Sequence, residues 1–160
     1  MFAMSENSKT PVIFLLSSAA ALIIAYILEY FFNMLPCKLC TYERVIHYIA
    51  GLIAIACILK NNKILIYMIF CSYIIGAVIS FYHIGLEFHW FYDVVGCTEQ
   101  TSANASVEEL RNNLLNPNYS PSCDRPYYIL GLSLATWNLI YSLAFLFISG
   151  KVYTERKKSK

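Results

Sequence analysis

The residues best suited to chemistry in this sequence are four cysteines that fall into two pairs. Cys37 and Cys40 form a C-x-x-C pair directly before an apolar stretch, whereas Cys97 and Cys123 bracket a long polar stretch. A C-x-x-C pair at the start of a helix has its sulfurs near the positive end of the helix dipole, which favours thiolate over thiol. A disulfide across so small a ring gains little chain entropy and is suited to redox cycling. We therefore expect Cys37 and Cys40 to be redox-active.

The other two cysteines of the polar regions leave more than one interpretation open. Cys97 and Cys123 could take part in the same redox chemistry, or they could form a structural staple for a long loop. Zinc is a third use of two cysteine pairs, but the second pair lacks C-x-x-C spacing and only His89 lies near a pair, so we expect no metal. Cys57 and Cys71 fall within apolar stretches, where we expect them to be buried small side chains.

Two charged residues follow the C-x-x-C pair closely. Glu43 and Arg44 lie where an apolar stretch begins, and charge is tolerated at a membrane boundary but is costly deeper. Arg44 is four residues after Cys40, so the two side chains share a helix face, with Arg44 one turn deeper. A fixed positive charge there would favour a thiolate or an electron-rich ligand.

The surrounding sequence must position these residues in lipid. It is 58% hydrophobic and only 14% charged, against roughly 25% charged residues in a soluble domain, which excludes an ordinary water-soluble globule. The net charge of +2 and the 16% aromatic content disfavour disorder and a nucleic-acid-binding surface. Four continuous apolar runs predict membrane-spanning helices and not barrel strands. The expected spans are 12–32, 41–59, 64–86 and 127–150, in a single all-α membrane domain over 1–160, a four-transmembrane-helix bundle.

The basic residues predict how this bundle is oriented. The N-terminal tail, the turn near 60–63 and the C-terminal tail together hold eight basic residues against two acidic ones, whereas the stretch 87–126 carries most of the acidic residues. By the positive-inside rule, both termini are cytoplasmic. The short loop 33–40 and the long loop 87–126 then face the periplasm or its equivalent. Because that side is oxidising, cysteine pairs in these loops are expected to form disulfides.

The long loop is expected to contain a short amphipathic helix. The residues 106–109 form a capping box, and Asn116-Pro117 ends the helical pattern. One apolar face is formed by Val107, Leu110, Leu114 and Leu115. We expect this helix to lie on the membrane surface, with docking to a partner protein as the alternative.

Taken together, these motifs resemble the DsbB family of bacterial inner-membrane disulfide oxidoreductases. The stretch 36–44, Pro-Cys-Lys-Leu-Cys-Thr-Tyr-Glu-Arg, matches the family's C-x-L-C-x-x-E-R signature. The stretch 82–87, followed by Trp90, resembles its H-x-G-L-E segment. Cys123 and the Leu-Gly-Leu-Ser at 130–133 resemble the start of its fourth span. The motifs occur in the family's order on four predicted spans.

The resemblance implies an enzyme that takes electrons from a periplasmic, thioredoxin-like oxidase of the DsbA type and passes them to ubiquinone or menaquinone in the membrane. It implies that the partner's thiolate attacks Cys97 in a disulfide with Cys123. Cys123 then exchanges with Cys37, and Cys40 is released as a thiolate that faces the quinone. The energetics are consistent, because DsbA has a potential near −120 mV and needs a stronger acceptor than NAD or glutathione.

The resemblance also implies a quinone site. Arg44 would bind a quinone oxygen, with Glu43 beside it and holding its side chain. His83 matches a family position near the quinone and His47 lies three residues beyond Arg44, so both are candidates for the same site, although each could instead be a packed hydrogen-bonding side chain. Lys38, inside the C-x-x-C, adds a positive charge that favours a thiolate.

Two other functions are compatible with parts of the pattern. A vitamin K epoxide reductase-like enzyme also passes thiol electrons to quinones, but its C-x-x-C lies late in the bundle, whereas here the pair opens the second span. A non-catalytic four-span protein stapled by Cys37–Cys40 and Cys97–Cys123 would give no reason for Arg44 at the membrane boundary.

Overall fold

The computed structural model describes residues 9–60, 62–98, 111 and 120–158. Within these ranges the chain forms four long helices and one short antiparallel hairpin. The elements are α1 (Lys9–Phe32), α2 (Lys38–Lys60), α3 (Lys63–Glu87), β1 (Tyr128–Ile129), β2 (Leu132–Ser133) and α5 (Leu134–Lys158). The chain is therefore mostly helical, as predicted.

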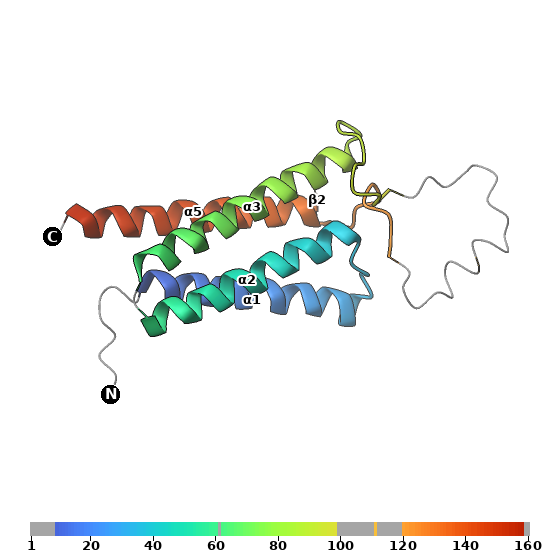
Figure 1. Ribbon diagram of the computed structural model, residues 1–160. Helices are drawn as coiled ribbons and strands as arrows, with labels where there is room; N and C mark the ends of the chain where they lie inside the picture. Colours follow the sequence, from blue (N-terminus) through green and yellow to red (C-terminus); the bar gives the residue numbers. More distant parts are fainter. Residues whose placement is uncertain (1–8, 61, 99–110, 112–119, 159–160) are drawn as a thin grey trace.

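The four helices run side by side as a bundle (Figure 1). α2 packs against α1 and α3, and α3 packs against α5. The start of α1, the turn between α2 and α3 and the end of α5 lie at one end of the bundle. The described parts of the segments that join α1 to α2 and α3 to α5, residues 33–37, 88–98 and 120–133, lie at the other end, so all four loop cysteines are brought to the same end.

Three of the described helices are long and apolar enough to cross a membrane, over Thr10–Phe32, Lys38–Lys60 and Ile64–Glu87. Their outer faces carry large apolar side chains, among them Phe31 and Leu59, which are 81% and 80% exposed. An apolar outer surface of this extent is typical of a protein whose solvent is lipid. Together with α5, a fourth helix of similar length, this confirms a multi-pass α-helical membrane protein.

α5 begins at Leu134, later than the start at 127 that hydropathy predicts. The preceding residues form the β1–β2 hairpin around Leu130 and Gly131, which have φ values of 52° and 83°. Positive φ at both central residues is the geometry of a tight two-residue turn. Ser133 then caps the helix, because its Oγ accepts a hydrogen bond from the backbone N–H of Thr136. The hairpin is as apolar as a helix, so hydropathy alone does not separate them.

The core below the cysteines ties α1 to α3. Tyr73 of α3 is almost fully buried, and its hydroxyl lies 2.9 Å from Ser17 Oγ and 3.1 Å from Ser18 Oγ of α1. On α2, the small residues Ala50 and Ala54 are fully buried and allow the neighbouring helices to approach closely. This packing fixes the helices that carry the site.

The two cysteines of the apolar stretches differ. Cys57 is buried as predicted, but the prediction that Cys71 is buried is wrong, because Cys71 is exposed on α3. A thiol is a small apolar group. On the outer surface of a membrane bundle it contacts lipid, so it does not have to be buried within the protein.

The predicted amphipathic helix, including its capping box at 106–109 and its apolar face, lies outside the described residues apart from Arg111. The side chain of Arg111 is exposed.

Candidate redox site

All four loop cysteines meet in one cluster at the end of the bundle. Cys37, Cys97 and Cys123 are buried, and Cys40 packs against them. Cys97 and Cys123 form a disulfide with a Cα–Cα distance of 5.4 Å. Cys37 and Cys40 are free thiols. A disulfide and a dithiol thus lie side by side, which is the arrangement that thiol–disulfide exchange requires.

Cys37 occupies the cap position of α2. Its Sγ accepts a hydrogen bond from the backbone N–H of Cys40 at 3.3 Å, and the two sulfurs are 3.1 Å apart. The hydrogen bond with the Cys40 side chain lowers the pKa of Cys37 most, burial opposes it, and His83 and the Cys40 N–H lower it further, to about 4. Cys37 is therefore held as a thiolate at neutral pH, in agreement with its place at a helix N-terminus.

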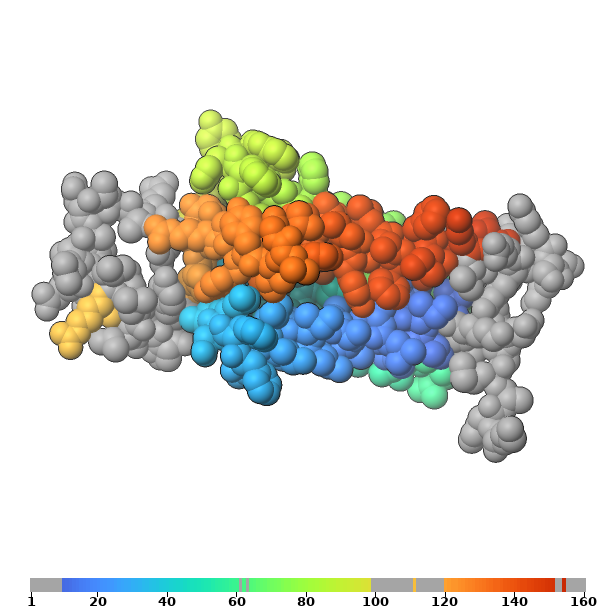
Figure 2. Space-filling model, turned by 180° about the vertical axis from the view of Figure 1, so that it is seen from behind, coloured from blue at the N-terminus to red at the C-terminus, as the bar shows by residue number. Residues whose placement is uncertain are grey.

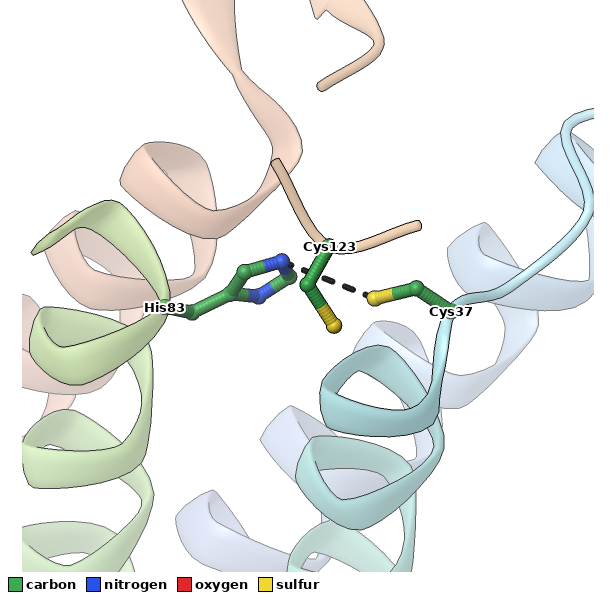
Figure 3. Close-up of side chains that lie close together, drawn as sticks. All are labelled: Cys37, His83 and Cys123. Atoms are coloured by element: carbon green, nitrogen blue, oxygen red, sulfur yellow. Dashed lines mark hydrogen bonds between the residues drawn. The ribbon is translucent and has the colours of Figure 1, made fainter. Parts of the chain in front are cut away.

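His83 of α3 lies against Cys37 and Cys123. Its Nε2 is 3.5 Å from Cys37 Sγ, and the three side chains point toward one another with their ligand atoms within 4.8 Å (Figure 3). On the other side of the ring, Nδ1 is 3.4 Å from Glu43 Oε1. Glu87 Oε1 lies 4.0 Å from Nε2. The imidazole is thus enclosed by two sulfurs and two carboxylates.

The same three side chains have the spacing of a metal site. However, Cys123 Sγ is bonded to Cys97, and metals bind cysteine as a thiolate. In this state the cluster is arranged for exchange between Cys37 and the disulfide. The absence of a metal remains a prediction.

A tight turn presents Cys97 to the site. The carboxylate of Asp93 accepts hydrogen bonds from the backbone N–H groups of Val95 at 3.0 Å, of Cys97 at 2.6 Å and of Thr98 at 2.6 Å. Burial raises the pKa of Asp93, but these bonds and that from the Thr98 hydroxyl outweigh it and lower the pKa to about 2. The sequence marks no role for Asp93, because an acid in a polar loop carries no signal by itself.

Two further bonds hold this turn over the C-x-x-C pair. Lys38 Nζ donates to the carbonyl of Gly96 at 2.6 Å, and the N–H of Cys123 donates to the carbonyl of Cys97 at 3.1 Å. Lys38 therefore connects α2 to the second loop through this hydrogen bond. The sequence predicts a different contribution from Lys38, a positive charge that favours a thiolate.

A pocket of about 620 Å³ opens beside Cys40, between α1, α2 and α5. Figure 2 looks onto this face, where a hollow separates α1 from α5. The pocket walls are mostly apolar, and Cys40, Glu43, Arg44 and His47 line its α2 side. Its size suits an organic ligand with an apolar body and a few polar contacts.

The pocket receives three of the four residues that the sequence assigns to a quinone site, namely Glu43, Arg44 and His47. His83 is not among its lining residues and lies on the side of Cys37. Cys40 lies between the two regions and lines both the pocket and a small cavity that His83 borders.

Arg44 is paired with α1. Its guanidinium forms an ion pair with Glu29, donates to the Ala25 carbonyl at 3.3 Å and lies 5.1 Å from the centre of the Tyr26 ring. The expectation that Glu43 holds Arg44 is therefore wrong. Consecutive residues of a helix point about 100° apart, so Glu43 turns to α3 while Arg44 turns to α1. Glu29 had a signal in the sequence, as the one charge within the first predicted span.

His47 belongs to a polar network below Arg44. Its Nε2 is 3.1 Å from Asn138 Oδ1, and Asn138 Nδ2 donates to Ser80 Oγ at 2.9 Å. Among the described residues, His47 Nδ1 is buried without a hydrogen-bond partner. This network joins α2, α5 and α3 along the wall of the pocket.

Comparison with known proteins identifies the group to which this arrangement belongs. The family described as "Disulfide bond formation protein DsbB" matches residues 7–152. The chain belongs to the DsbB family. It is also 26% identical over 148 residues to the uncharacterized protein RP370 of Rickettsia prowazekii, a match that covers 89% of this chain and 86% of the relative. No solved structure matches the chain.

Membership of the DsbB family makes the protein an oxidoreductase of disulfide bond formation. The family match favours this function over a vitamin K epoxide reductase-like enzyme. The same match favours this function over a non-catalytic four-span protein.

Proposed function

We propose that this DsbB-family protein oxidises a periplasmic DsbA-like dithiol protein and passes the electrons to a quinone of the bacterial inner membrane. The observation that carries the proposal is the position of the C-x-x-C pair: Cys37 Sγ lies within 4.8 Å of Cys123 Sγ, while Cys40 lines the apolar pocket. Electrons therefore have a route from the loop disulfide to a site open to lipid.

The first four steps are exchanges between sulfurs. A thiolate of the partner attacks Cys97, which forms a mixed disulfide and releases Cys123 as a thiolate. The second thiol of the partner then displaces Cys97, so the partner leaves oxidised. Cys123 attacks Cys37 in a Cys37–Cys40 disulfide, which releases Cys40 as a thiolate. Renewed attack by Cys97 on Cys123 restores the loop disulfide and leaves both thiols of the C-x-x-C pair reduced.

The last step takes place at the pocket. A quinone ring would lie among the apolar side chains, with one oxygen toward the guanidinium of Arg44, which stabilises the negative charge that develops there. Two electrons pass from the C-x-x-C pair to the quinone, together with two protons, and the Cys37–Cys40 disulfide forms again. Ubiquinone and menaquinone both satisfy this chemistry.

The proposed topology has α5 as the fourth span and both termini in the cytoplasm. Lys60, Lys63 and the basic end of α5 would then lie on the cytoplasmic side. The cysteine cluster, at the opposite end of the bundle, would face the periplasm.

The direct test is catalysis by the purified protein in lipid nanodiscs. Reduced DsbA-like protein is added with ubiquinone or menaquinone, and quinone absorbance and partner thiols are followed together. Wild type should turn over with at least one quinone, and Cys40→Ser should abolish turnover. Cys71→Ser is the matched control, because this thiol is exposed on α3. Full activity in Cys40→Ser would overturn the proposal.

A further inference from the structure

Formation of the Cys37–Cys40 disulfide must release protons as well as electrons. Two thiols become a disulfide with loss of two electrons and two protons, and a quinone becomes a quinol by gaining the same number of each. Cys40 lines the pocket, so its proton has a direct path. Cys37 is only 5% exposed and is not among the lining residues. The proton that Cys37 loses when it ionises therefore needs a carrier.

The structure provides two side chains between Cys37 and the pocket. Cys37 Sγ is 3.5 Å from His83 Nε2, and His83 Nδ1 is 3.4 Å from Glu43 Oε1. Glu43 also lines the pocket. Three titratable groups thus form a continuous buried row from the thiol to the ligand site, and imidazole can accept a proton on one nitrogen and release one from the other.

We propose that His83 and Glu43 form a proton relay from Cys37 to the quinone pocket, an inference that rests on the proposed function. When exchange releases Cys37 in reduced form, it ionises to the thiolate, and its proton passes to His83 Nε2 at 3.5 Å. The proton on Nδ1 passes to the Glu43 carboxylate, and Glu43 gives a proton to a quinone oxygen. The imidazole then carries its proton on Nε2 and returns to the Nδ1–H tautomer before the next turnover. With the proton of Cys40, the quinone receives two.

The neighbouring charges leave Glu43 free for this role. Arg44, next in sequence, is paired with Glu29 instead. Besides Cys37 and Glu43, the groups that face His83 are Glu87 and Cys123. Cys123 is in a disulfide and does not titrate. Glu87 contacts the same imidazole but does not line the pocket, so it lies off the path.

A purely structural role for the Glu43–His83 contact predicts different behaviour. If the contact only joins α2 to α3, then glutamine at position 43, which is similar in size and can still hydrogen-bond, should preserve the rate. If Glu43 carries a proton, glutamine should stop the transfer, and aspartate should restore part of it.

The test follows the quinone step alone. Full-length protein in nanodiscs, with Cys37 and Cys40 reduced, is mixed rapidly with ubiquinone or menaquinone in H₂O and D₂O across a range of pH. Glu43→Gln and His83→Gln should each slow quinone reduction about a hundredfold, the usual size of a general acid–base contribution. Both should also change its pH profile and solvent isotope effect. Glu43→Asp should recover part of the rate, and Glu87→Gln should stay close to wild type.

Three further results distinguish a failure of the relay from a failure of the proposed function. Reduction of Cys97–Cys123 by the partner dithiol should be unchanged in Glu43→Gln, which shows that this variant is folded. Wild-type rates in Glu43→Gln and His83→Gln, or an equal loss in Glu87→Gln, would overturn the relay. If wild type does not reduce quinone at all, the proposed function fails, and the relay fails with it.

Discussion

The sulfur atoms of Cys37 and Cys123 lie within 4.8 Å of one another, although the two residues come from different loops of the chain. A disulfide bond is about 2 Å long, so a small movement brings these atoms to bonding distance. The contact joins the disulfide of the long loop to the C-x-x-C pair at α2, and the proposed electron route passes from one pair to the other through it.

The first prediction concerns this contact. In the double variant Cys40→Ser/Cys97→Ser, Cys37 and Cys123 are left without their usual partners and should form a disulfide with each other under mild oxidation. Labelling of the remaining thiols with a bulky maleimide, followed by electrophoresis, measures the product. The matched variant Cys37→Ser/Cys97→Ser leaves Cys40 and Cys123, which should crosslink more slowly. Equal rates in the two variants would contradict the geometry.

The second prediction is that Cys37 is ionised in the reduced protein down to about pH 4. The hydrogen bond with Cys40 lowers its pKa against the effect of burial, and His83 lowers it further. The thiolate absorbance that Cys37→Ser removes should therefore persist through neutral pH and disappear as pH falls through about 4. His83→Gln should move this transition upward. A transition near the ordinary cysteine pKa of about 8.5 would contradict the assignment.

The third prediction concerns Arg44. Loss of a hydrogen bond to a charged group costs about 1.5–3 kcal/mol, so Arg44→Ala should raise the apparent KM for quinone by about 10- to 100-fold. Since this change also leaves Glu29 without its partner, Arg44→Ala/Glu29→Gln is the necessary comparison. If the double variant recovers the wild-type KM, the effect came from the unpaired carboxylate and Arg44 does not bind quinone.

The sequence predicts the spans and the cysteine chemistry because both depend on residues that are close together in the chain. Long uncharged runs identify helices in lipid, and the C-x-x-C spacing before such a run places Cys37 at a helix cap, as the structure has it. Four-residue spacing likewise places Arg44 on the pocket side with Cys40. These features need no knowledge of how the helices pack.

The partners of the charged residues could not be predicted in the same way. Glu43 faces His83 and Arg44 faces Glu29 because the rotation of α2 between its neighbours determines which helix each side chain meets. The hairpin at 128–133 is hard to predict for a different reason, since its residues are as apolar as those of a span and only the turn residue Gly131 marks it.

The fourth prediction concerns the turn that presents Cys97. Asp93→Ala removes the acceptor for several backbone N–H groups and should slow reduction of the Cys97–Cys123 disulfide by partner dithiol, without changing the KM for quinone. Asp93→Asn keeps one acceptor oxygen and should have a smaller effect. If Asp93→Ala changed only the KM for quinone and not the rate of disulfide reduction, the prediction would be contradicted.

The pH dependence of this turn follows from the lowered pKa of Asp93. A carboxylate with a depressed pKa stabilises the folded form fully above its unfolded value of about 3.9. That contribution is lost as pH falls through about 2. The rate of disulfide reduction, corrected for the ionisation of the partner thiol, should therefore show no step from Asp93 between neutral pH and about pH 4.

The last prediction concerns Gly85, where the long loop leaves α3. The Gly85 carbonyl accepts hydrogen bonds from the N–H groups of Trp90 at 2.7 Å and of Phe91 at 3.3 Å, and a Cβ at this position would overlap the Phe91 ring. Phe91 stacks on Tyr82, whose hydroxyl donates to the Tyr92 carbonyl at 3.0 Å. Gly85→Ala must displace this ring and, with it, the segment that leads to Cys97.

The expected loss is that of an aromatic pair, about 0.5–1.5 kcal/mol, together with slower reduction of the loop disulfide. Thermal unfolding and the rate of reaction with partner dithiol measure the two effects. Gly76→Ala in the same helix is the control, since its Cβ would meet Ile46 at an ordinary contact distance of 3.4 Å. If both alanines slow disulfide reduction equally, the cause is a general effect on α3 and not the position of Phe91.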